Sequence, residues 1–110
     1  GMYPLAVTVD PSGRFVYVAN NGSGTNPGNV SAYTITVNGT LTEVRGSPFR
    51  AGNSPYAVTV DPSDKFAFVA NEYSNNVSAY FIDQRTGALF QLPDSPFPAG
   101  SIPNSIITTR

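Results

Sequence analysis

Short runs of apolar residues, separated by turn-forming residues, extend along the whole chain. In its second half these runs are rich in Val, Phe, Tyr and Ile, the residues favoured in β-strands. Several runs are apolar at consecutive positions instead of alternating, which indicates strands covered on both faces. No segment shows the spacing of an amphipathic helix, and Pro and Gly recur too often for long helices. The pattern predicts an all-β fold.

The predicted strands belong to a sequence repeat. Residues 6–20, AVTVDPSGRFVYVAN, return as residues 57–71, AVTVDPSDKFAFVAN, with 11 of the 15 positions identical. The segment NVSAY at 29–33 returns at 76–80. A four-stranded sheet that recurs every ~40–50 residues is typical of a β-propeller blade. We therefore predict two four-stranded antiparallel blades and one extra strand.

The repeat divides the chain into three parts. Residues 1–53 form the first repeat, with Gly1 interpreted as a tag scar, and residues 54–101 form the second. Residues 102–110 begin a third repeat, of which 105–109 would be the first strand. The strands expected in the second repeat are 56–60, 66–70, 77–82 and 88–92.

Turn chemistry supports these strand boundaries. Asp61-Pro62 suits the first two positions of a type I turn. Gly13, and Asp64 at the matching place, are expected to adopt a left-handed backbone. Pro93, Pro96 and Pro98 are expected to end strand pairing and carry the chain to the next repeat.

Two blades cannot close a ring, because propellers usually have about four to eight. Open blades would expose apolar faces, and such faces favour association. Two explanations stay open: the chain is part of a larger propeller, or several copies form a homo-oligomer through their blade edges and faces. Three copies would give six blades and four would give eight.

Composition excludes several kinds of chemistry. The chain has no His and no Cys, so a Ser-His-Asp triad, thiolate catalysis and His- or Cys-ligated zinc are absent from it. Net charge is −1, without a basic stripe, which argues against nucleic acid or an anionic membrane as partner. No motif indicates a cofactor or a metal, and no residue is predicted to be catalytic.

The segments FVYVANN and FAFVANE, each followed by NVSAY and then SPF, resemble the YVTN-type repeats of lactonase-like seven-bladed β-propellers. The resemblance covers nearly the whole chain and rests on strand and turn residues. It implies a 6-phosphogluconolactonase-like relationship, and a bacterial protein that is secreted, periplasmic or at the cell surface. Enzymes of this family are thought to use His and Arg in a central pocket. The absence of His leaves no catalytic residue to carry over.

Candidate ligand-binding residues lie in the loops expected on one end of the propeller, near its channel. There a small molecule or a protein could bind. The alternative for Asn20 and Asn71, which match in the two repeats, is that they cap strand ends. Glu72 has Asn21 as its counterpart; in an assembled ring, several copies of Glu72 could converge on a cation. The candidates are Asn20, Asn21, Asn71, Glu72, Tyr73 and Tyr56.

Two other pairs of repeated residues are expected to have structural rather than functional roles. Asp10 and Asp61 resemble paired carboxylates, but each opens an Asp-Pro-Ser turn that accounts for it. Phe49 and Phe97, in matching SPF segments, are expected to pack between blades.

Three functions remain from the sequence. The first is a non-enzymatic structural or interaction module, favoured by low charge and the missing catalytic side chains. The second is a lactonase-type hydrolase, supported by family resemblance alone. The third is an oligomeric sugar-binding lectin, which the absence of Trp disfavours because such sites depend on aromatic stacking.

Overall fold

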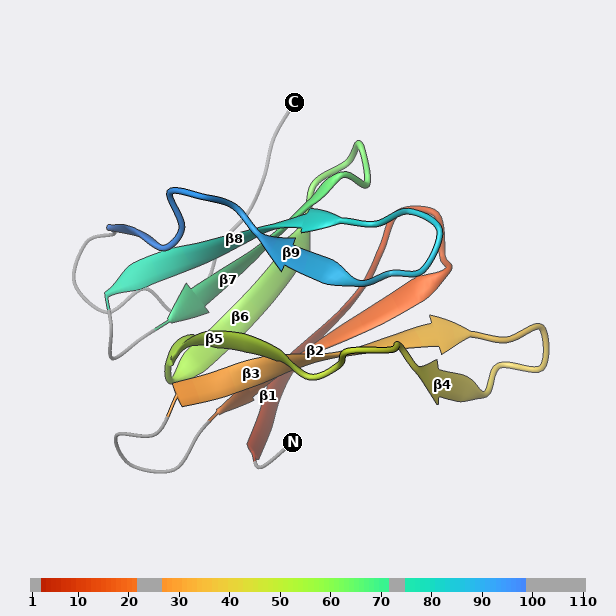
Figure 1. The fold of residues 1–110 in the computed structure, drawn as a ribbon. Coiled ribbons are helices and arrows are strands. Elements are labelled where there is room, and N and C mark those ends of the chain that lie inside the picture. Colours follow the sequence, from red (N-terminus) through yellow and green to blue (C-terminus); the bar gives the residue numbers. More distant parts are fainter. Residues whose placement is uncertain (1–2, 22–26, 72–74, 99–110) are drawn as a thin grey trace.

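The computed structural model describes residues 3–21, 27–71 and 75–98, which form two antiparallel sheets (Figure 1). These residues contain no helix, and thus none long and apolar enough to cross a membrane. Each sheet corresponds to one sequence repeat. The predicted all-β architecture of two blades is confirmed.

The first blade contains the strands β1 to β5. Strands β1, β2 and β3 pair in chain order, and β4 and β5 both pair with β3. The chain therefore follows a simple meander whose outermost strand is in two pieces. Their bounds are β1 (Tyr3–Val9), β2 (Phe15–Asn21), β3 (Pro27–Ile35), β4 (Leu41–Glu43) and β5 (Phe49–Asn53).

The second blade repeats this arrangement. Strands β6, β7 and β8 pair in order, and both β9 and β10 pair with β8. Their bounds are β6 (Pro55–Val60), β7 (Phe66–Asn71), β8 (Asn76–Ile82), β9 (Leu89–Gln91) and β10 (Phe97–Pro98).

The outermost strand differs from the prediction. Prolines after β9 were expected to end pairing, yet Phe97 and Pro98 pair with Val77 and Asn76 of β8. Pro can occupy this place because an edge strand has one side without ladder hydrogen bonds. Each blade is thus four strands plus one short return, and the expectation that pairing stops at the prolines was wrong. The predicted strand at 105–109 lies outside the described residues.

The turns between the first two strands of each blade follow the predicted chemistry. Gly13 and Asp64 have φ of 75° and 68°, which confirms the left-handed backbone at this position. The Asp10 carboxylate accepts hydrogen bonds from the backbone N–H of Arg14 and Phe15. Asp61 binds the corresponding amides in the second blade. These bonds hold the start of β2 and β7 against the turn.

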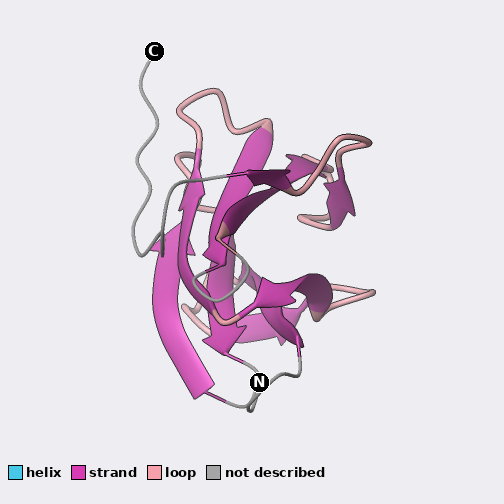
Figure 2. Cartoon of the chain, turned by 90° about the vertical axis from the view of Figure 1, so that its left-hand side faces the viewer, coloured by secondary structure: helices cyan, strands magenta, loops and turns pink. Residues whose placement is uncertain are grey.

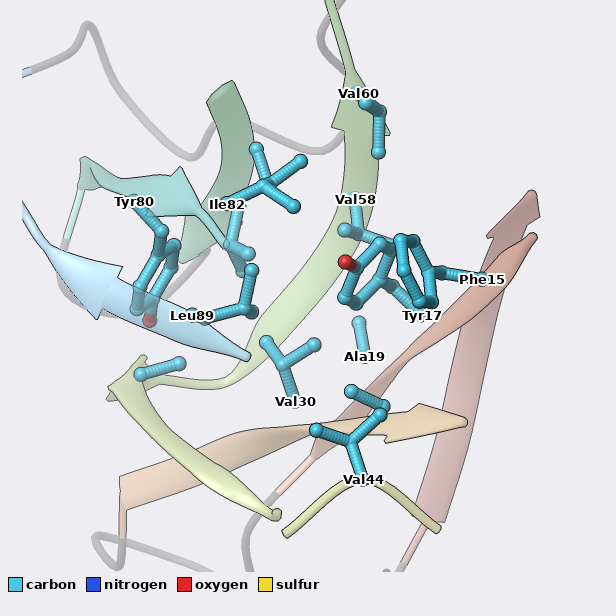
Figure 3. Packing of buried hydrophobic residues seen from close by; sticks show 14 residues of the cluster. Phe15, Tyr17, Ala19, Val30, Val44, Val58, Val60, Tyr80, Ile82 and Leu89 are labelled. Atoms are coloured by element: carbon cyan, nitrogen blue, oxygen red, sulfur yellow. The ribbon is translucent and has the colours of Figure 1, made fainter. Parts of the chain in front are cut away.

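The two blades pack face to face as two layers, which Figure 2 shows edge-on as sheets that splay apart at one side. Strand β6 lies against β1 and β2. Between the layers, Phe15 and Tyr17 of the first blade point at Val58 of the second, while Val30 lies towards Leu89 (Figure 3). One apolar core thus joins the blades.

Candidate functional site

The sheets have two chemically different ends. At one end β2 and β7 finish and β3 and β8 begin, and asparagines of both blades lie there; we call it the amide end. At the other end lie the turns that follow β1 and β6, with Asp10, Asp61 and Asp64; we call it the acid end. Four of the amide-end asparagines match in pairs between the blades: Asn20 with Asn71, and Asn29 with Asn76.

Asn71 joins three segments at the amide end. Its Nδ2 donates to Asn76 Oδ1 at 2.9 Å and to Ser78 Oγ at 2.8 Å. Its Oδ1 accepts the Gly52 N–H, at 3.1 Å, from the end of the first blade. A Cβ on Gly52 would lie 2.9 Å from the Asn71 amide, so the close approach requires glycine. Asn71 is fully buried and ties one blade to the next.

Asn20 makes the matching bonds in the first blade. Its Nδ2 donates to Asn29 Oδ1 at 2.8 Å and to Ser31 Oγ at 2.7 Å. Because β-strand side chains alternate, Asn29 and Ser31 fall on the same face and can share this donor. Asn20 is also buried. The amide donors of both predicted site residues are therefore engaged within the sheets.

Other predicted site residues are more open. Asn21 ends β2 and is half-buried, and Tyr56 is exposed. Between Pro55 and Ala57 the register of β6 shifts, which leaves Tyr56 outside the ladder. Such bulges redirect a side chain, here out towards solvent. Glu72 and Tyr73 lie outside the described residues.

A shallow pocket of about 270 Å³ opens beside the amide end of the first blade. Its lining includes the exposed Arg50 and the half-buried Asn29. Sequence reasoning missed Arg50 because Pro98 replaces it in the second repeat, so the repeat pattern gave no signal. The lining residues are Pro27, Gly28, Asn29, Pro48 and Arg50.

The acid end brings together two carboxyl groups from different blades. Asp10 is buried and faces Asp64, and Asp10 Oδ2 accepts a hydrogen bond from Ser12. Arg14 places Nη2 3.5 Å from Asp64 Oδ2 and donates through Nη1 to the Gln84 carbonyl at 2.8 Å. This pairing was missed because Asp64 takes the place of Gly13 in the repeat and meets Asp10 only across the interface.

Environment drives the two pKa values apart. Burial raises the pKa of Asp64, and so does a hydrogen bond shared with Asp10, which only a protonated carboxyl can donate. Burial acts in the same direction on Asp10, but hydrogen bonds from Ser12, Asp64 and two backbone amides outweigh it and lower its pKa. When Asp64 is ionised, its buried Oδ1 has no hydrogen-bond donor among the described residues. The pKa of Asp64 therefore lies above the usual value of an aspartate, and that of Asp10 lies below it.

The geometry limits what the acid end can do. Split carboxyl pKa values are typical of acid–base sites, but structural pairs show them too. Asp10 is 2% exposed, so a substrate cannot reach it. In the part of the chain that the structure describes, no three His, Cys, Asp or Glu side chains are grouped as a metal site would need. The acid end fastens the blades through the ion pair between Arg14 and Asp64.

Two neighbouring antiparallel blades, joined by one core and repeated in sequence, define a segment of a β-propeller. The family model described as lactonase, 7-bladed beta-propeller, matches residues 3–102. The chain belongs to this family, as the repeat segments indicated.

Two relatives carry the name 6-phosphogluconolactonase. The protein of Formosa agariphila is 30% identical over 95 residues, covering 86% of this chain and 26% of the relative. That of Bacillus subtilis is 32% identical over 97 residues, covering 84% and 26%. The chain thus spans about a quarter of the length of these relatives. They favour the lactonase alternative over a non-enzymatic module.

Solved structures agree on the fold. A protein of Bacteroides fragilis matches with a TM-score of 0.79 at 24% identity, over 90% of this chain and 26% of that one. A periplasmic gluconolactonase of Pseudomonas aeruginosa matches with a TM-score of 0.72 at 23% identity, over 89% and 26%. At this identity the likeness shows the fold alone.

Proposed function

We propose that the chain forms two neighbouring blades of a lactonase-type propeller that hydrolyses a phosphorylated sugar lactone of the 6-phosphogluconolactone kind. The observation that carries the proposal is the family match over residues 3–102, together with two relatives of that name. In the reaction, water adds to the lactone carbonyl, the ring C–O bond breaks, and the released alkoxide takes up a proton.

The acid end and the amide end differ in charge and in the hydrogen-bonding groups that they offer to such a substrate. A phosphorylated sugar lactone is anionic and rich in hydroxyl groups. Carboxylates of the described residues lie in the acid-end turns or along the outer segments, and none lies at the amide end. There, Asn21 and Tyr56 offer hydrogen-bonding groups for hydroxyls, and Arg50 offers a cation for the phosphate. We infer that the substrate binds at the amide end.

The test measures loss of 6-phosphogluconolactone against its spontaneous hydrolysis. We expect the complete propeller that contains these two blades to hydrolyse the lactone faster than buffer alone does. Tyr56→Ala should lower kcat/KM by about tenfold, since a stacking and hydrogen-bonding contact is worth roughly 1.4 kcal/mol. Arg50→Gln should raise KM for the phosphorylated lactone more than for unphosphorylated gluconolactone. Arg45→Gln, an exposed arginine outside the pocket, is the control for charge.

The result that would contradict the proposal is a complete propeller that contains these two blades, verified as folded by circular dichroism, and does not accelerate hydrolysis. It would favour the non-enzymatic module. The lectin function has no support among the relatives reported above. For location, the low charged fraction of 12% supports a site outside the bacterial cytoplasm, which cell fractionation would test.

A further inference from the structure

The chain passes from the first blade to the second through a single residue, Ser54. Strand β5 ends at Asn53, and β6 begins at Pro55, which pairs with Asn71 of β7; we call residues 52–55 the blade corner. Ser54 is buried and has a φ of 54°. Among the non-glycine residues of positive φ in the described part of the chain, it alone is neither Asn nor Asp. Such strain persists only where the surroundings fix the backbone, and it is frequent at functional sites.

Contacts from both blades fix the blade corner. The Pro55 ring is fully buried and lies against Gly28 of β3. A Cβ on Gly28 would overlap this ring and the Asn20 carbonyl oxygen, so the close approach requires glycine. At the other end of the corner, the Gly52 N–H donates to Asn71 Oδ1 at 3.1 Å. The corner is therefore held by the first blade at Pro55 and by the second blade at Gly52.

Tyr56 follows the blade corner directly and is the residue that the corner can position. The register shift between Pro55 and Ala57 leaves Tyr56 outside the ladder. The first blade has the same shift, with Leu5 at the matching position. The bulge therefore belongs to the design of both blades, whereas the tyrosine occurs in only one of them.

Strand β6 borders the axis of the propeller. It is the edge strand of its sheet and lies against β1 and β2, and the two sheets splay apart away from these strands (Figure 2). Because the blades of a propeller surround a central channel, the edge where two sheets converge is the edge beside that channel. Tyr56 lies at the amide end of β6, and thus at the mouth of the channel, whichever blades complete the ring.

We propose that Ser54 and Gly28 are positioning residues, which hold Tyr56 at the channel mouth as a preorganised contact for the sugar ring of the substrate. A tyrosine ring offers an apolar face for stacking and a hydroxyl for hydrogen bonding. A side chain on a fixed backbone loses less freedom when a ligand binds, and its contact is more precise. This inference rests on the proposed function and adds the residues through which Tyr56 acts.

A fluorine label on Tyr56 measures its position independently of activity. The complete propeller that contains these two blades would carry a fluorinated tyrosine at position 56, observed by fluorine NMR. Gly28→Ala places a methyl group against Pro55 and should shift or split the resonance. Ser54→Val should do the same, because a β-branched residue is strongly disfavoured at positive φ. Ser54→Gly adopts this φ freely and should leave the resonance in place.

Gly87→Ala is the matched control for a disturbed blade interface. Gly87 lies between β8 and β9, at the acid end, and its new methyl group would meet the Phe15 ring of the other blade. This variant should be less stable than the wild type but should leave the fluorine resonance of Tyr56 unchanged. Circular dichroism verifies that each variant is folded.

Kinetics tests whether the blade corner acts through Tyr56. Gly28→Ala and Ser54→Val should each lower kcat/KM for 6-phosphogluconolactone by up to about tenfold, the loss expected for Tyr56→Ala. Ser54→Gly should retain the wild-type value. In the Tyr56→Ala background, adding Gly28→Ala should cause a further loss of less than about twofold, because no ring remains to be positioned.

The outcomes distinguish this inference from the proposed function. A resonance that moves in Gly28→Ala and Ser54→Val, with losses that do not multiply with that of Tyr56→Ala, would support the positioning role. An active propeller with an unmoved resonance, or with losses that multiply, would overturn the positioning role alone. A complete propeller without lactonase activity would overturn the proposed function and the substrate contact of Tyr56, and the resonance would still decide whether the corner positions this side chain.

Discussion

Val9 in the first blade and Val60 in the second have the same residue type and the same strand position, and each is followed by the sequence Asp-Pro-Ser. Val9 is 52% exposed and Val60 is 8% exposed. Val60 is buried because it belongs to the core between the two blades. Burial in this fold is therefore a property of the neighbouring blade, not of the residue, and matched positions in the two blades serve as internal controls for each other.

Truncating the matched leucines should give the largest contrast. Leu89→Ala leaves a cavity in the core and should cost about 2–4 kcal/mol of unfolding free energy. Leu41→Ala removes an exposed side chain and should change it by less than about 0.5 kcal/mol. Urea denaturation, at a dilution where the chain is monomeric, measures both. Equal losses would show that the leucines share one environment.

The matched glycines separate backbone strain from packing. Gly39→Ala and Gly87→Ala both force alanine to a positive φ, which costs about 1 kcal/mol. Gly87→Ala also drives a methyl group into the Phe15 ring and should cost a further 1–3 kcal/mol or so. Urea midpoints of the two variants give the difference directly. A Gly39 variant as unstable as the Gly87 variant would contradict the assigned contact.

The matched tyrosines test one hydrogen bond. Tyr80 is buried, which raises its pKa to about 12, and its hydroxyl bonds to the Arg50 carbonyl. Tyr80→Phe leaves that carbonyl without its donor and should cost about 1 kcal/mol. Tyr33→Phe should cost almost nothing in the monomer. Thermal unfolding of the two variants measures the difference. Similar shifts in Tm for Tyr80→Phe and Tyr33→Phe would contradict the assigned hydrogen bond.

The acid pair gives the smallest effect, and its sign depends on pH. Since the pKa of Asp64 is raised in the folded state, its stabilising contribution is present below the unfolded pKa, about 4, and is lost as pH rises through the folded value. Asp10 and Asp61 have the opposite effect, because their pKa values are lowered in the folded state. Their carboxylates stabilise the folded state above the unfolded pKa, and this contribution is lost as pH falls through the folded pKa values.

Asp64→Asn should therefore raise stability at pH 7 by up to about 1 kcal/mol, because an amide can donate to Asp10 without ionising. The lost ion pair with the half-exposed Arg14 offsets little of this. At pH 3 the gain should vanish. Urea titrations at both pH values provide the measurement; a variant less stable than the wild type at pH 7 would show that the Arg14 contact dominates.

The fold could be predicted from sequence because the repeat carries the same strand and turn signals twice. Asp-Pro turns and the residues at Gly13 and Asp64 act within a few positions, so local chemistry suffices. The return strands β5 and β10 could not be predicted. Their pairing depends on how the chain folds back onto β3 and β8, and Pro and Gly give no strand signal.

The candidate site was predicted less completely. For Asn20 and Asn71 the sequence offers strand capping as the alternative to ligand binding, and in the structure their amide nitrogens donate to side chains of the neighbouring strand. Arg50 and the Asp10–Asp64 pair break the repeat, so they become visible only when the two blades are placed together. Residues that recur in both repeats therefore indicate the fold, whereas residues that differ between the repeats indicate what is specific to one blade.

Thiol labelling tests most directly whether a facing blade determines burial. The chain has no cysteine, so Val9→Cys and Val60→Cys each introduce one reporter. In the dilute monomer, Cys at position 60 should react about a hundredfold more slowly than at position 9, because labelling must await opening of the interface. Equal rates at the two positions in the monomer would contradict the account.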